Sequence, residues 1–219
     1  MYQQQTAGFA PSLTRDQTAT LFSQVMWLVA GTAGVFTLGV YVGRNLSSGW
    51  AIVGLIGGFG CLIVLNFARR MSAQGQLALL AGMGFLLGIA MGPGLAYISS
   101  VEPQAVWQAA GATALFMAGF GSVGYLTRRD LSALGRISFF ALIALILFGI
   151  VLIFVRIPAA EMLYSILGLV IFAGLTLFDF QRLRRSRGIT SAPVLAASIF
   201  LDALNVFLFF LRIFSGGRD

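Results

Sequence analysis

The sequence predicts an all-α membrane protein, built as a bundle of seven transmembrane helices. Of its 219 residues 58% are hydrophobic and only 10% are charged, and the mean hydropathy is +0.93. These values are typical of polytopic membrane proteins. Seven apolar segments, each near the roughly 20 residues that a spanning helix requires, occupy residues 21–42, 50–68, 77–98, 106–126, 137–155, 162–180 and 194–213. We therefore expect a polar N-terminal tail (1–20), one transmembrane domain (21–214) and a short C-terminal tail (215–219).

The first four segments carry signals for position and packing. The polar start lacks the basic region and cleavage site of a signal peptide. Glycines recur at helical spacing and should let helix backbones approach closely: Gly54 and Gly58; Gly84, Gly88 and Gly92; Gly111, Gly119, Gly121 and Gly124. The lone Cys61 is expected to be a small core residue. Gly92-Pro93-Gly94 predicts a break in the third segment, a feature tolerated at membrane depth only when it is buried or lines a cavity.

Arginines predict the orientation of the later segments. All fourteen basic residues are Arg, and the chain has no His. The connections after segments two, four and six hold nine of them, whereas the opposite connections hold only two; the nine are Arg69, Arg70, Arg128, Arg129, Arg136, Arg182, Arg184, Arg185 and Arg187. The positive-inside rule then places the N-terminus in the cytoplasm and the C-terminus outside. Orientation in a membrane, not nucleic-acid binding, accounts for the formal charge of +7. Asp130, just before the fifth segment, is predicted to cap its N-terminus.

Segments six and seven form a predicted helical hairpin that carries two acids, Asp179 and Asp202. Its only plausible turn, residues 188–191, is centred midway between them. Antiparallel helices that meet there bring the acids to one height, roughly 17 Å from the turn, well inside a hydrocarbon core about 30 Å thick. An ionisable side chain at that depth costs several kcal/mol unless it has a partner, so the pair is a candidate functional site.

Polar side chains one helical turn away could complete this site: Ser198 and Asn205 beside Asp202, and Thr176 and Arg182 beside Asp179. Two neighbouring carboxylates in a low dielectric cannot both stay ionised cheaply, so they should titrate as a unit and sense protons in a chain without histidine. Arg69, at the end of segment two, is the basic residue best placed to pair with them. The alternatives are that Asp179 pairs only with Arg182, that one acid lies at an interface, and that Arg69 is an interfacial anchor.

Several chemistries lack their residues. There is no phosphate-binding glycine loop ending in GK[ST], no HExxH and no Ser-His-Asp triad, so we expect no enzyme and no cofactor. Calcium prefers six to eight oxygen ligands, and Asp179 and Asp202 supply at most four, so any bound calcium should be weakly held or transient. An intramembrane aspartyl protease also uses two aspartates, but Asp202 lies in Phe-Leu-Asp, without the Gly-x-Gly-Asp setting of those enzymes.

The hairpin sequences LFDFQRLRR (177–185) and IFLDALNVFLFFLRIF (199–214) resemble the closing signature of the Bax inhibitor-1 family. The resemblance extends to the basic end of segment two, the proline of segment three, and TRRDLSALG (127–135). It implies a seven-helix bundle in the bacterial inner membrane with the seventh helix at its centre. It also implies a pH-sensitive calcium or other cation leak, with Asp179 and Asp202 as the sensing pair and Arg69 as a latch.

A second function follows from the same resemblance. Gly111-Ala112-Thr113-Ala114-Leu115-Phe116 is similar to a stretch of a bacterial branch whose members include modulators of a membrane-anchored ATP-dependent protease. Some of those members lack the aspartate pair, which this chain retains. The resemblance therefore leaves two alternatives. One is a cation leak, and the other is a non-channel protein that binds such a protease through its exposed N-terminal tail, Met1–Arg15.

Overall fold

Seven long helices make up the computed structural model of the chain, which describes residues 15–68, 71–154, 158–186 and 192–216. They are α1 (Arg15–Gly43), α2 (Ser48–Phe67), α3 (Ala73–Val101), α4 (Pro103–Leu126), α5 (Ser132–Phe154), α6 (Pro158–Arg185) and α7 (Ala192–Ser215). All seven are long and apolar enough to cross a membrane, and no strand occurs within the described ranges. The predicted number of spans is confirmed. The structure describes α1 from Arg15, and the apolar span of this helix begins at Ala19.

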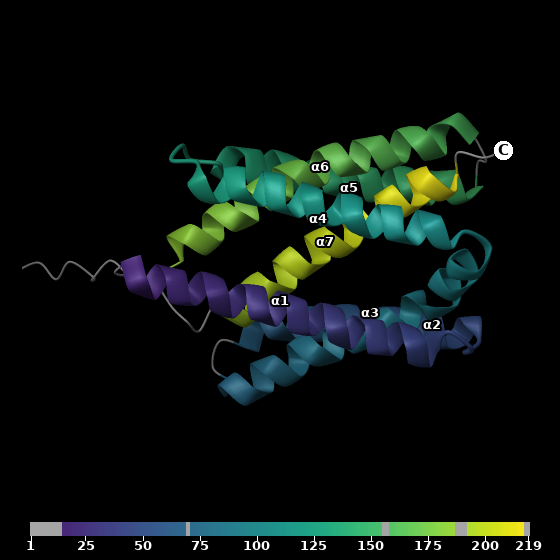
Figure 1. Cartoon of the computed structure of the whole chain (residues 1–219), viewed down its shortest axis with the longest axis horizontal. Helices are drawn as coiled ribbons and strands as arrows, with labels where there is room; N and C mark the ends of the chain where they lie inside the picture. Colours follow the sequence, from purple (N-terminus) through teal and green to yellow (C-terminus); the bar gives the residue numbers. More distant parts are fainter. Residues whose placement is uncertain (1–14, 69–70, 155–157, 187–191, 217–219) are drawn as a thin grey trace, which may run out of the picture.

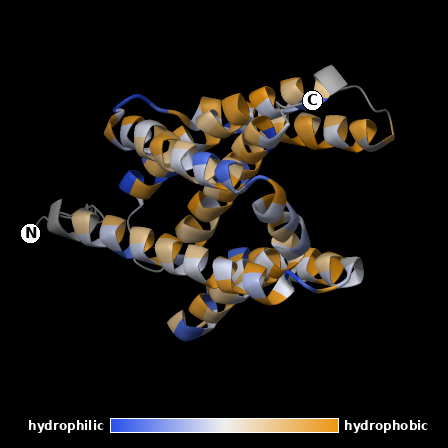
Figure 2. Ribbon diagram, turned by 45° about the vertical axis from the view of Figure 1, so that its right-hand side comes forward, coloured by the Kyte–Doolittle hydropathy of each residue, from blue (hydrophilic) through white to orange (hydrophobic). Residues whose placement is uncertain are grey.

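The helices form two groups with α7 between them (Figure 1). Helices α1, α2 and α3 lie side by side in one group, α4, α5 and α6 form the other, and α7 crosses obliquely from one to the other. In the spanning part of α7 56% of the residues are buried, against 17–39% in the other helices. The helices are largely hydrophobic along their lengths, and hydrophilic residues gather toward their ends (Figure 2). Many large hydrophobic side chains are exposed, among them Trp27, Ile56 and Phe140. This distribution is expected of a bundle that exposes its flanks to lipid.

Glycines bring α1 and α3 into backbone contact. A Cβ added at Gly88 would collide with the carbonyl oxygen of Phe36, and one at Gly39 would collide with that of Phe85. Gly84 and Gly92 also pack on α1, as expected. The same expectation is wrong for part of α4: Gly121 and Gly124 pack on α6, but Gly111 and Gly119 have nothing within 4 Å in the described structure. Spacing alone did not separate packed glycines from those with open space beside them.

The break predicted at Pro93 is absent, since α3 runs without interruption from Ala73 to Val101. Proline cannot donate a hydrogen bond to the carbonyl four residues earlier, which here belongs to Ile89. That carbonyl faces Gly43 of α1, and Gly92 packs on the same glycine. The close backbone of α1 therefore covers the interrupted turn, and the helix continues through it.

Candidate functional site

Asp179 of α6 and Asp202 of α7 lie together in the interior of the bundle. Their exposed fractions are only 8% and 5%, and the two carboxyl groups interact electrostatically with each other. The hairpin thus brings both acids to one place. It does so asymmetrically: α6 ends at Arg185, six residues after Asp179, whereas α7 begins at Ala192, ten residues before Asp202. At 1.5 Å per residue Asp179 is only about 9 Å from the end of its helix.

One oxygen of Asp202 has no hydrogen-bonding partner among the described residues. Its Oδ2 atom is buried and accepts no hydrogen bond from the described residues. The hydroxyl of Thr176, itself fully buried, lies close to the Asp202 carboxyl group; the same hydroxyl lies 3.9 Å from the sulfur of Met117 on α4. A carboxyl group with an unpartnered oxygen in an apolar interior is costly, which makes this position a candidate functional site.

Asp179 has one nearby cation among the described side chains. The Arg182 guanidinium lies 3.9 Å from it, at the outer limit of an ion pair, and is itself half exposed. A contact this long contributes little, and it coexists with the interaction between the two acids. The alternative in which Asp179 pairs only with Arg182 is therefore incomplete, because Asp179 also interacts with Asp202. Arg69, the expected latch, lies outside the described residues; Ala68, directly before it, is buried at the end of α2.

The other expected polar partners contribute less to the acids. Asn205 donates its amide to the Leu201 carbonyl of its own helix at 2.8 Å, which occupies that nitrogen within α7. Ser198 is half-buried on the same helix. Of the four expected polar partners, two have side chains close to an acid in the described structure: Thr176 lies near Asp202, and Arg182 lies near Asp179.

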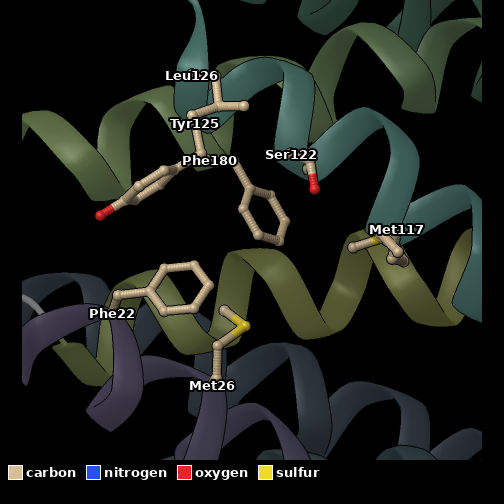
Figure 3. Close-up of a pocket in the computed structure, with 9 residues that line it drawn as sticks. Phe22, Met26, Met117, Ser122, Tyr125, Leu126 and Phe180 are labelled. Atoms are coloured by element: carbon tan, nitrogen blue, oxygen red, sulfur yellow. The ribbon is translucent and has the colours of Figure 1, made fainter. Parts of the chain in front are cut away.

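An apolar pocket of about 370 Å³ lies beside the acids, between α1 and α4. Figure 3 shows its walls, which include Phe22 and Met26 of α1 and the ring of Phe180 from α6. Met117 lines this pocket and also contacts Thr176, which lies close to Asp202. The side chains of Met117 and Thr176 therefore connect the wall of the pocket to Asp202. Sequence patterning gave no indication of this pocket, because its walls are ordinary apolar residues of three separate helices.

A second polar cluster joins the connection between α4 and α5 to the end of α6. Gln181, only 1% exposed, accepts the Leu131 N–H at 2.9 Å and donates to the Arg129 carbonyl at 2.6 Å. Arg184 donates to the Thr127 carbonyl at 2.5 Å. Sequence reasoning used these arginines only for orientation, and no local pattern marks Gln181 as a residue that reaches a segment fifty positions away.

Asp130 belongs to this cluster and lies two residues before the start of α5. Its Oδ1 accepts the Ser132 hydroxyl at 2.7 Å and the Ser132 N–H at 3.0 Å. Because α5 begins at Ser132, Asp130 lies one residue before the cap position where we expected it and acts through an Asx turn. Arg185 forms an ion pair with it at 3.0 Å. The Ser132 hydrogen bonds, followed by Arg185, hold the pKa of Asp130 below its usual value of 3.8.

The described residues contain no group of three or more His, Cys, Asp or Glu side chains that could hold a metal ion. The acid pair offers two carboxyl groups, fewer oxygens than a stable calcium site requires.

Comparison with known proteins identifies the family to which this chain belongs. The family model described as "Inhibitor of apoptosis-promoting Bax1" matches residues 18–219. The chain is 31% identical to an uncharacterized protein of Deinococcus radiodurans, with 94% of each chain covered. It is also 31% identical to the inner membrane protein YbhL of Escherichia coli K12, covering 89% of this chain and 84% of YbhL, and 29% identical to an uncharacterized protein of Chlamydia muridarum, covering 86% and 87%. The described chain has seven helices apolar and long enough to span a membrane, and its relative YbhL is an inner membrane protein. The chain is therefore a multi-pass inner membrane protein. The chain belongs to the Bax inhibitor-1 family.

Proposed function

We propose that this protein is a pH-sensitive cation leak of the inner membrane, gated by Asp179 and Asp202. The observation that carries the proposal is the pair of buried, mutually interacting carboxyl groups on adjacent membrane helices, with Asp202 Oδ2 unpartnered. Buried ionisable residues at membrane depth are expensive and are a mark of ion or proton pathways. In a chain without histidine, carboxyl groups are the groups available for proton sensing.

The gate works through the charge of the pair. Two ionised carboxylates side by side repel each other and attract a cationic side chain, and we assign that role to Arg69, next to the buried end of α2. A proton that enters the pair removes negative charge and weakens the attraction. The closed state then loses its latch, so the leak should increase as the pH falls.

The proposed cargo is calcium or a similar cation. Two carboxyl groups give a hard oxygen site with at most four ligand atoms, fewer than the six to eight that calcium prefers. An ion held this incompletely can leave again, which suits conduction. The weak 3.9 Å contact between Arg182 and Asp179 leaves the pair open to compete for such an ion.

A calcium flux assay in proteoliposomes tests the proposal. The purified full chain is reconstituted around a calcium-sensitive dye, and the leak is measured from pH 5.5 to 8. We expect Asp179→Asn and Asp202→Asn to flatten the pH profile, because each removes one titrating group. Glu161→Gln is the matched control: it neutralises an exposed acid on the same helix as Asp179, in its first turn, and should keep the wild-type profile.

Two results would overturn the proposal. One is a wild-type leak equal to that of protein-free liposomes at every pH. The other is a pair of aspartate variants with the same pH profile as Glu161→Gln. A null leak would favour the alternative, modulation of a membrane-anchored ATP-dependent protease. Co-purification with such a protease, lost on deletion of residues 1–14, which lie outside the described part of the chain, would support that function.

A further inference from the structure

A second cavity lies at the arginine-rich end of the bundle, away from the apolar pocket of Figure 3. It has a volume of about 350 Å³ and is formed by the last turns of α6 and the first residue of α5, with the lining residues Ser132, Phe178, Gln181, Arg182, Arg185 and Ser186. Two guanidinium groups thus face one open cavity. The proposed leak does not use it.

The guanidinium groups retain hydrogen-bonding capacity. Each arginine has five N–H donors in a planar fork. In the described structure Arg185 directs Nη1 to Asp130 at 3.0 Å and Nη2 to a carbonyl at the long distance of 3.4 Å. Among the described residues, the Arg182 guanidinium has only the 3.9 Å contact with Asp179. Both side chains are close to half exposed, at 43% and 44%, so an incoming anion can reach them without a buried rearrangement.

The surrounding charges favour an anion. The described residues at this end carry the arginines Arg128, Arg129, Arg136, Arg182, Arg184 and Arg185 and the acids Asp130 and Asp179. Positive charge is in excess even with both acids ionised. The wall behind the cavity is fixed, because the Gln181 amide is committed to Leu131 and Arg129. Two arginines on a rigid wall match the oxygens of a phosphate group, which guanidinium binds with paired hydrogen bonds.

We propose that this cavity is a binding site for a phosphate ester, held by Arg182 and Arg185 from adjacent turns of α6. The ester belongs either to the headgroup of an anionic phospholipid or to a soluble phosphate. Basic pockets between transmembrane helices at the cytoplasmic surface bind lipid headgroups, and Phe178 gives the cavity one apolar wall. The site extends beyond the proposed leak and does not depend on it.

Asp130 competes with this ligand. Its carboxylate occupies Arg185 at 3.0 Å, and its pKa is held below the usual value, so it is ionised at neutral pH. A phosphate group must share Arg185 with this acid and share Arg182 with Asp179. Neutralising Asp130 should therefore tighten binding, an effect opposite to that of removing either arginine.

Native mass spectrometry of the purified full chain in a neutral detergent tests the site. Phosphatidylglycerol and phosphatidylcholine are titrated separately, and glycerol 1-phosphate is added as a soluble competitor. We expect one phosphatidylglycerol to bind more tightly than phosphatidylcholine, whose choline cation the arginines repel. Arg182→Gln and Arg185→Gln should each weaken binding at least about tenfold, as expected for loss of a charge-assisted hydrogen bond. Asp130→Asn should tighten it several-fold, and Arg182→Lys should keep part of the affinity.

The control is Arg136→Gln, which removes an exposed arginine from the first turns of α5, outside the lining of the cavity. It should bind like the wild type, and thermal unfolding of every variant checks that the fold persists. Competition by glycerol 1-phosphate would identify a soluble ester as a ligand, and failure to compete would identify the lipid headgroup. The proposal is overturned if phosphatidylglycerol binds no more tightly than phosphatidylcholine and glycerol 1-phosphate does not bind, or if Arg182→Gln binds like Arg136→Gln.

Discussion

Gln181 should hold the connection between α4 and α5 in place, and replacing it with leucine should release that connection. The amide is 1% exposed and makes two short hydrogen bonds, 2.9 Å from Leu131 N–H and 2.6 Å to the Arg129 carbonyl. Leucine keeps the apolar packing but leaves both backbone groups without this partner. Each unsatisfied group costs about 1–3 kcal/mol, and because the connection can regain water when it opens, we expect a loss of about 2–4 kcal/mol in total.

Limited proteolysis measures this loss where it occurs. Trypsin cleaves after Arg128 and Arg129, which lie in the anchored connection, and it acts on locally opened states. When opening is fast relative to cleavage, the cleavage rate follows the opening free energy. A loss of about 2 kcal/mol then predicts cleavage about thirtyfold faster in Gln181→Leu than in the wild type.

Gln76→Leu is the matched control for this experiment. Gln76 is also a buried amide, 6% exposed, but it lies on α3 and donates to the carbonyls of Ala68 and Met71, at 3.2 and 3.3 Å. The same substitution there should lower the thermal midpoint without changing cleavage after residues 128 and 129. The reasoning fails if Gln181→Leu is cut within twofold of the wild-type rate, or if Gln76→Leu is cut there as fast as Gln181→Leu.

Two further predictions concern helix packing and pH. Gly39→Ala should destabilise the protein by about 2 kcal/mol or more, as overpacking does, because its Cβ would meet the Phe85 carbonyl. Gly34→Ala on the same helix, where a Cβ has nothing within 4 Å, should be neutral or slightly stabilising. Thermal unfolding in detergent compares the two variants. The stabilisation from Asp130 should be present above its usual pKa of 3.8 and disappear as the pH falls through its lower folded-state pKa. Unfolding midpoints of wild type and Asp130→Asn across pH should therefore differ at neutral pH and converge in acid; a constant difference would contradict the assignment.

Hydropathy predicted the spanning segments but not the ends of the helices. A lipid-facing span requires about twenty apolar residues, so the seven segments were visible in the sequence. The sixth was expected to end at residue 180, where the apolar run stops, yet α6 continues to Arg185. Gln and Arg are good helix formers, so the helix continues beyond the point where the apolar run stops. This added turn carries Gln181, Arg182, Arg184 and Arg185, which make most of the polar contacts at this end.

The contacts between distant segments could not be predicted in the same way. Gln181 meets Leu131 across fifty residues, and a single sequence contains no signal for that pairing. The glycines show the same limit: Gly119 and Gly121 are two residues apart, but only Gly121 faces another helix, where a Cβ would strike the ring of Phe180. Which side of a helix faces a neighbour depends on how the helices are placed, and in a membrane both sides are apolar.

The position of the acids along their helices affects how protons could reach them. Equal distances from the turn predicted a pair roughly 17 Å deep, but Asp179 lies six residues from the end of α6, about 9 Å along its axis. Helix α7 runs obliquely through the bundle (Figure 1), and Asp202, which ten residues of α7 precede, interacts with Asp179. The pair is therefore nearer the arginine-rich end than symmetry suggested, and Arg182 lies one turn beyond Asp179 on the way out. A proton from that side has the shorter path, so pH on the arginine-rich side should control the proposed gate; liposomes with a pH step on one side at a time would separate this from control by the opposite side.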